Sequence, residues 1–518
     1  MSQMLKSSGA MGAATLLSRV LGMVREIAYA RFMGDGWVAG AFTLAFTIPN
    51  LFRRLLGEGA LTAAFIPLLK EQEKTASEAE MWRSANAVLS ALVVFAAGVV
   101  ALVLAGLSLA LAVGEFDAKT RLMLELLRVM FPYMLLVCVA AVFMGVLNAR
   151  GHFFIPALGA TLLNVVMITS VLVAAPRFGP TLDTQIFALA VGVLVAGVAQ
   201  AAFQLPSLRR EGWRLAWVTP WQNDTVRQVV SRMVPGMIGV AAFQMNVTLV
   251  QLVSFWVDPV IVASFSYAVR LMELPQGVFG ISLATYLLTS LSGLAAEKKL
   301  PEFRATLGQG LGYLVVINGL ATVLLMTLAE PMVRLLFERG QFGPASTERA
   351  AEALLALAPG LVAFSMVNIL ARAFYALGDT RTPMKVSIFC LGVNLLLSVL
   401  FISHLRQAGL GLANSLSSAL NVWLLLRALR KKLGTLELAE LRRSSKSVIG
   451  AMLVGAIFAW GLHLSWDSQL GHATLALRLG AVFLPATLAA VMYWVVLWGD
   501  QLPAAVEVLA LLRKKLRR

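Results

Sequence analysis

Two arginines and a glutamate lie within the first long apolar segment of the chain, where a membrane would provide no water. They are Arg19, Arg25 and Glu26, all inside residues 18–26. A charge at the centre of a bilayer costs about 3 kcal/mol on insertion scales, so such residues normally face a cavity and meet a charged partner. These residue types at this place predict an internal binding site for an anion.

Two more apolar segments, the second and the eighth, carry charged and amide residues near their middles. These residues are Asn50, Arg53, Arg54, Glu58, Arg270 and Glu273. Arg54 and Glu58 are spaced i, i+4, and Arg270 and Glu273 are spaced i, i+3. Each pair could therefore form an ion pair on its own helix. Internal pairing is therefore the alternative to ligand binding for these four residues.

Arginines outnumber glutamates by five to three in the three charged segments, a local excess of about +2. That excess favours an external anion over internal partners alone. The planar guanidinium fork donates two parallel hydrogen bonds to a phosphate. A unit charge pair in contact is worth about 4 kcal/mol at an effective dielectric of 20, so two or three arginines would offset much of the dehydration cost of a diphosphate.

The composition indicates the kind of protein that positions these charges. Hydrophobic residues make up 59% of the 518 residues and charged residues only 14%, against about 25% charged in soluble domains. We count fourteen apolar segments, each long enough to cross about 30 Å of hydrocarbon. Continuous runs of this kind exclude the alternating pattern of a β-barrel. The sequence predicts an all-α polytopic membrane protein with 14 transmembrane helices, the first of them retained rather than cleaved.

The net charge of +16 is concentrated in alternate short connections and in the C-terminal tail. Arginine-rich connections follow the sixth and twelfth segments, near Arg209 and Lys431, whereas the intervening connections are sparser in Lys and Arg. The positive-inside rule then places both termini in the cytoplasm. This distribution explains the basic charge without a nucleic-acid partner.

A weak internal repeat relates the two halves of the chain. One set of identical residues recurs at an offset of 227: Pro132, Ala149, Gly151 and Pro156 with Pro359, Ala376, Gly378 and Pro383. Another recurs at an offset of 223: Phe42, Ala45, Gly57 and Thr62 with Phe265, Ala268, Gly280 and Thr285. We expect two six-helix lobes, residues 1–215 and 216–435, followed by two C-terminal helices in residues 436–518. Substrate would lie between the lobes, and Pro49 and Pro275 would kink a helix in each.

The cysteines and histidines do not form a recognisable site. Cys138 and Cys390 both fall in apolar segments, where packing is the usual role of a free cysteine. None of the four histidines has the spacing to a carboxylate or cysteine that a metal or nucleophile site requires. We expect no metal, no cofactor and no disulfide.

Four long motifs stand out: Ser-Arg-Val-Leu-Gly-Met-Val-Arg-Glu at 18–26, Pro-Asn-Leu-Phe-Arg-Arg-Leu-Leu-Gly-Glu-Gly-Ala at 49–60, Arg-Leu-Met-Glu-Leu-Pro-Gln-Gly-Val-Phe-Gly at 270–280 and Leu-Phe-Glu-Arg-Gly-Gln-Phe at 336–342. They resemble motifs of the MurJ (MviN) family, the proposed lipid II flippases of bacteria. The resemblance covers essentially the whole chain. It implies the V-shaped fold of the multidrug/oligosaccharidyl-lipid/polysaccharide exporters, with a groove for a prenyl tail on the last two helices.

The resemblance also implies a cargo and the residues that hold it. The cargo would be lipid II, undecaprenyl-diphosphate-linked MurNAc-pentapeptide-GlcNAc, moved to the outer leaflet of the bacterial inner membrane, with membrane lipids and cell-wall synthesis proteins as further partners. The residues implied for the headgroup are Arg19, Arg25, Glu26, Asn50, Arg53, Asn164, Arg270 and Glu273. Arg25 is expected to bind the diphosphate, Arg19 to assist it, and Glu26 to keep the site from holding its cargo too tightly.

The chain departs from the family pattern at Gly40 and Val269, where some relatives have Asp, and at Thr47, where some have Lys. Some members use a sodium site in the second lobe, but a hard cation wants several oxygens and usually a charge. The residues that could couple transport to an ion here are Glu58, Asn246, Asn368 and Asn394. Proton coupling through Glu26, Glu58 or Glu273, or the membrane potential, stays open.

Two other functions stay open at this point. An exporter of another prenyl-diphosphate-linked glycan would need the same arginines. A membrane enzyme acting on lipid-linked sugars would need a catalytic base or a carboxylate cluster at the membrane surface, and the short connections offer none.

Overall fold

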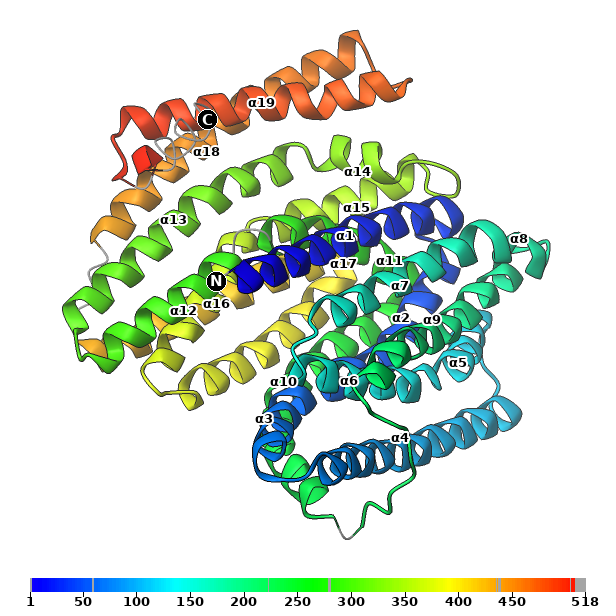
Figure 1. The fold of residues 1–518 in the computed structure, drawn as a ribbon. Helices are drawn as coiled ribbons and strands as arrows, with labels where there is room; N and C mark the ends of the chain where they lie inside the picture. The colour runs from blue at the N-terminus through cyan, green and yellow to red at the C-terminus, as the bar shows by residue number, and fades with distance from the viewer. Residues whose placement is uncertain are drawn as a thin grey trace. The chain divides into compact units, whose positions relative to one another are not determined.

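The computed structural model describes the backbone of residues 2–57, 60–221, 223–277, 281–434, 436, 439–503 and 505–507. These residues form helices and no strand (Figure 1), so the all-α prediction is confirmed. The chain divides into two compact units, Met1–Ala263 and Ser264–Arg518. The repeat-based boundaries after residues 215 and 435 stay a prediction.

The first unit is built on α1 to α10. Its elements are α1 (Ser2–Met33), α2 (Trp37–Phe52), η1 (Arg53–Gly57), α3 (Ala60–Thr75), α4 (Glu78–Val113), α5 (Ala118–Met130), α6 (Tyr133–Ala149), α7 (Phe154–Thr169), η2 (Ser170–Ala174), α8 (Ala175–Phe178), α9 (Leu182–Arg210) and α10 (Asp224–Val257). Helix α1 packs on α7, α2 on α5, and α6 on α9. Aromatic rings such as Phe65, Phe131 and Tyr133 fill the core between them.

The second unit takes over within α11 (Pro259–Pro275). Its other elements are α12 (Ile281–Ala296), α13 (Leu300–Thr327), α14 (Ala329–Phe337), α15 (Pro344–Leu357), α16 (Gly360–Ala376), α17 (Arg381–Leu433), α18 (Ala439–Gln469) and α19 (Leu475–Gly499). The C-terminal pair, α18 and α19, packs together and against α13 (Figure 1). The Tyr493 hydroxyl donates to the Val316 carbonyl at 2.6 Å, and a side chain at Gly319 would collide with Val448 and Tyr493.

Nine helices of the described residues are long and apolar enough to cross a membrane, or ten if the bent pair α15–α16 counts as one span. The 53-residue α17 is counted once, but its backbone leaves the helical region at Arg406 (φ 47°). Asn394 donates to Ser417 at 3.3 Å across this break, so the two halves of α17 fold back on each other. The structure thus shows a polytopic chain with nine or ten candidate spans when α17 is counted once, and the fourteen spans stay a prediction.

The same turn occurs at repeat-related positions in each unit. Gly151 and Gly378 both adopt positive φ, 85° and 74°. The next residue donates five positions back in each case, from His152 to the Leu147 carbonyl and from Asp379 to the Phe374 carbonyl. This is the left-handed helix end that glycine favours. The offset of 227 in the sequence therefore corresponds to a shared local structure.

Ion pairs fix each of these turns to the end of a later helix. The turn supplies the positive partners in the first unit and the negative partner in the second. In the first unit, Arg150 and His152 contact Glu211 at 2.8 and 2.7 Å, and Arg150 also contacts Glu73 at 2.6 Å. In the second unit, Asp379 contacts Lys432 at 2.8 Å. These ion pairs join the turn to the C-terminal end of a later helix of the same unit, α9 in the first unit and α17 in the second.

We expect acid to weaken the second of these attachments. The hydrogen bond from Lys432, followed by those from the Thr382 backbone and hydroxyl, holds the pKa of Asp379 well below its usual range. A carboxyl group with a depressed folded-state pKa stabilises the fold above its unfolded pKa of about 3.9, and this contribution is lost as pH falls through the folded pKa. Asp379→Asn should lower the thermal unfolding temperature at pH 7, with the difference from wild type shrinking below about pH 4. The exposed Asp183→Asn is the control; equal effects of the two changes would contradict this role.

The departure from the family pattern at Gly40 has a structural reason. A Cβ atom at Gly40 on α2 would lie 2.2 Å from the carbonyl oxygen of Pro259, at the start of α11. No side chain fits there, least of all an aspartate. We expect Gly40→Ala to lower the free energy of unfolding by about 1–3 kcal/mol, as overpacking does. Gly98→Ala, at a helical site with open space around it, is the matched control; thermal unfolding that is equal in the two variants would contradict the close approach.

Candidate functional site

Arg25 is held on three sides within the first unit. Its Nη2 atom donates to Glu26 Oε1 at 2.5 Å and its Nη1 atom donates to Asn164 Oδ1 at 3.1 Å. Its guanidinium lies 5.4 Å from the centre of the Tyr29 ring. The side chains of Arg25 and Glu26 are only 12% and 10% exposed, so the charge of Arg25 is preorganised and nearly buried.

Asn164 connects this arginine to the backbone of its own helix. While its Oδ1 atom accepts from Arg25, its Nδ2 atom donates to the Ser18 carbonyl at 3.1 Å. Gly22, on the same helix, lies beside this side chain, and a Cβ there would be 3.8 Å from Nδ2, an ordinary van der Waals distance. Asn164 of α7 therefore fixes the direction of Arg25 on α1. Its predicted contact with a sugar or peptide stays a prediction.

The second charged segment forms a π-helical turn rather than a simple kink. Pro49 lies inside α2, and η1 begins at Arg53; such wide turns often occur at functional sites. Arg53 Nε donates to Asn50 Oδ1 at 2.7 Å. Arg54 Nη1 contacts Gln244 Oε1 on α10 at 3.5 Å. Glu58, the predicted partner of Arg54, lies outside the described residues.

The predicted residues of α11 contact each other in the second unit. Arg270 Nη1 donates to Glu273 Oε2 at 2.8 Å, with 41% and 47% of the two side chains exposed. Their i, i+3 spacing allowed this internal pairing. Arg19 is exposed on α1. It is not one of the residues that hold the Arg25 side chain, which are Glu26, Asn164 and Tyr29.

Three of the four predicted coupling residues lie in the described part of the chain. Asn246 is buried on α10, Asn368 donates to the Phe364 carbonyl at 3.1 Å, and Asn394 donates to Ser417. Among the residues that were placed, no group of three or more His, Cys, Asp or Glu side chains could hold a metal ion. In the first unit, the guanidinium groups of Arg25 on α1 and Arg53 after α2 each bond to a neighbouring side chain.

The motif at 336–342 forms a joint between three helices of the second unit. Phe337 and Phe342 are buried against Tyr267 of α11, with ring centres 5.0 and 5.2 Å away. Tyr267 lies three residues before Arg270, about one helical turn. The aromatic half of the joint thus supports the helix that carries Arg270.

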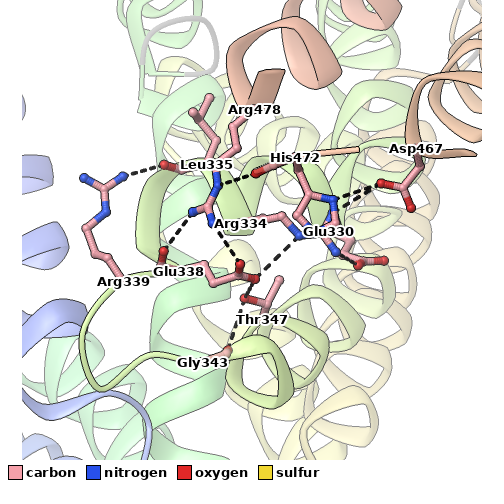
Figure 2. A network of polar contacts seen from close by, with 10 residues as sticks. All are labelled: Glu330, Arg334, Leu335, Glu338, Arg339, Gly343, Thr347, Asp467, His472 and Arg478. Atoms are coloured by element: carbon pink, nitrogen blue, oxygen red, sulfur yellow. Dashed lines mark hydrogen bonds and ion pairs between the residues drawn. The ribbon is translucent and has the colours of Figure 1, made fainter. Parts of the chain in front are cut away.

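The polar half of the joint connects the end of α14 to α18 and α19 (Figure 2). Arg478 Nη1 donates to the Glu338 carbonyl at 2.9 Å and its Nη2 atom lies 3.3 Å from Glu338 Oε1. Glu338 Oε2 also accepts from Thr347 at 2.8 Å and lies 3.5 Å from Arg334 Nε. Figure 2 shows Asp467 on the far side of Arg334, at 4.0 Å, where it also contacts His472. Ion pairs therefore attach the C-terminal pair α18–α19 to the end of α14. The hydrogen bond from Tyr493 attaches the same pair to α13.

Sequence reasoning missed several partners. Tyr29 stands four residues after Arg25, so helical spacing could have revealed it. Gln244 and Arg478 could not be found in this way, because each contacts a residue more than a hundred positions away.

The comparisons with known proteins agree with one another. The family described as "Lipid II flippase MurJ" matches residues 29–480. The chain is 32% identical over 498 residues to the "Probable lipid II flippase MurJ" of Vibrio cholerae serotype O1, covering 92% of this chain and 94% of the relative. It is 32% identical over 497 residues to the "Lipid II flippase MurJ" of Burkholderia cenocepacia, covering 93% and 95%.

Solved structures show the same fold. The structure described as "Lipid II flippase MurJ, inward closed conformation" superposes with a TM-score of 0.77 at 20% identity, covering 94% of this chain and 99% of the other. An inward-facing multidrug resistance MATE family transporter of the MOP superfamily follows with a TM-score of 0.64 at 16% identity, covering 82% and 99%. At these identities the likeness concerns the fold alone.

Proposed function

The chain belongs to the MurJ family of lipid II flippases, and from this membership we propose that it moves lipid II across the bacterial inner membrane by alternating access. It is a transporter and not an enzyme, and a multi-pass protein of that membrane. The cargo is an anionic lipid whose diphosphate must pass through hydrocarbon. No bond of the cargo is made or broken.

The observation that carries the proposal is the setting of Arg25. Its guanidinium is directed by Glu26, Asn164 and Tyr29 on two packed helices, so little conformational entropy is lost when a diphosphate arrives. Arg53 and Arg270 supply further donors, each beside a polar neighbour on its own helix. Arg19 assists, and Asn50, Asn164 and Glu273 complete the binding set.

We propose the finer architecture from the sequence repeat. The fourteen spans form two six-helix lobes, with the cargo headgroup between them and both termini in the cytoplasm. Helices α18 and α19 provide the groove for the prenyl tail. Because this pair is attached to α13 and α14, the groove moves with the second unit.

A flippase must also release its cargo. Glu26 already occupies one guanidinium nitrogen of Arg25, so it competes with the diphosphate and limits the affinity of the site. Coupling to an ion would involve Glu58, Asn246, Asn368 or Asn394, and cell-wall synthesis proteins would receive the cargo outside.

A leaflet assay with purified protein tests the function. Proteoliposomes that contain fluorescent lipid II are treated with a membrane-impermeant quencher, with and without a membrane potential. We expect the protein to move lipid II between leaflets, and an undecaprenyl-diphosphate carrying an unrelated glycan to move more slowly. No movement above protein-free vesicles would contradict the proposal, and faster movement of the other glycan would favour the alternative exporter.

A further inference from the structure

The connection between α9 and α10 is attached along α4 rather than free. Trp213, at its start, is only 2% exposed and stacks on Trp82 of α4 with ring centres 6.1 Å apart. Its indole nitrogen donates to Asn86 Oδ1 at 3.0 Å. The segment that follows has a fixed starting point on the helix.

Side chains of α4 then bind the backbone of this connection. Asn86 donates to the Arg214 carbonyl at 2.9 Å, and Ser90 accepts from the Val218 amide at 3.2 Å. With the backbone turned toward α4, large apolar side chains point outward. Trp217 and Trp221 are 66% and 73% exposed.

The depth of this segment follows from the surface of α4. The helix has 36 residues, about 54 Å at 1.5 Å per residue, which exceeds about 30 Å of hydrocarbon. Its strongly exposed apolar residues begin at Phe95 and end at Val113, a rise of about 27 Å. We infer that the hydrocarbon boundary at the N-terminal end of α4, where the connection is attached, lies near Phe95. Tryptophan rings favour the headgroup level at such a boundary.

A cavity of about 530 Å³ opens at this boundary, between α4, the connection and the first turns of α10. Its walls include Phe95, Trp221, Asn223, Arg227 and Ser231. Arg227 is exposed and has no ion-pair partner among the residues that the structure describes. Asp224, the nearest acid on α10, does not line the cavity.

We propose that this cavity binds an anionic phospholipid of the adjacent leaflet, with its phosphate on Arg227 and its glycerol and first acyl carbons against Phe95 and Trp221. A guanidinium suits a phosphate, and the apolar walls suit the chains that follow it. Each basic side chain beside a membrane increases the affinity for anionic lipid by about fivefold. This site is separate from Arg25 and does not depend on flipping.

Native mass spectrometry of the full-length protein tests the site. Phosphatidylglycerol and phosphatidylcholine with identical chains are titrated onto wild type, Arg227→Glu and Arg232→Glu. Arg232 is an exposed arginine of the same helix outside the cavity. Arg227→Glu should fold, because an acid suits the first turn of a helix.

We expect phosphatidylglycerol to occupy one site at about fivefold lower concentration than phosphatidylcholine. Arg227→Glu should remove that preference, Arg227→Lys should retain most of it, and Arg232→Glu should leave it unchanged. Equal occupancy by the two lipids in wild type, or equal losses in the two glutamate variants, would overturn the proposal. Glycerol phosphate has the charge but no chains, so its competition at the same concentration would also overturn a lipid site.

Discussion

We expect the Arg25→Ala variant to be unable to support growth of a strain depleted of its own lipid II flippase. Arg25 is the guanidinium that the first unit holds in place with Glu26 and Asn164. A contact between unit charges is worth about 4 kcal/mol at an effective dielectric of 20. If half of that is realised as the cargo crosses, transport falls by about thirtyfold or more.

The matched control is Arg31→Ala, which removes the same charge from an exposed position further along α1. It should grow normally, and Arg25→Lys should be impaired, because an ammonium keeps the charge but loses the fork that contacts both Glu26 and Asn164. Membrane insertion is checked by the amount of full-length protein in isolated membranes. Normal growth with a fully inserted Arg25→Ala protein would exclude Arg25 from cargo binding.

The composition was sufficient to predict the class of fold, and the charged segments singled out the residues that we propose for the site. A long apolar run that crosses a membrane can hardly adopt any structure other than a helix. An arginine within such a run is conspicuous because burying its charge in hydrocarbon is costly. The repeat at an offset of 227 even located a turn, since Gly151 and Gly378 both require a backbone that other residues avoid.

The sequence did not indicate which distant side chains contact the arginines. Asn164 lies 139 positions from Arg25, and Gln244 lies 190 positions from Arg54. No helical period connects such residues, because their contact depends on which helices pack together. Pro49 predicted a disturbed helix, but the π-helical turn at Arg53 depends on packing as well as on the proline. Gly40 looked like a departure from the family and is explained only by the carbonyl of Pro259.

Loss of Glu338 should be among the most damaging changes outside the arginine site. Its side chain is 11% exposed and contacts Arg334, Arg478 and Thr347. Removing one member of a buried charge pair typically costs about 3–5 kcal/mol, since the remaining charges lose their partner. We expect Glu338→Ala to lower the unfolding temperature of the purified protein strongly, whereas Glu348→Ala, at an exposed position of α15, should have little effect.

A double-mutant cycle between Glu338 and Arg478 then separates the joint from general loss of stability. Residues in one ion-pair network show coupling energies of about 0.5–3 kcal/mol, whereas distant residues are additive. We therefore expect the combined Glu338→Ala and Arg478→Ala variant to be less destabilised than the sum of the two single changes. Additive losses would show that Arg478 does not hold α19 through Glu338. Coupling would instead mean that this motif joins the C-terminal pair to α14, while its two phenylalanines support the helix of Arg270 through Tyr267.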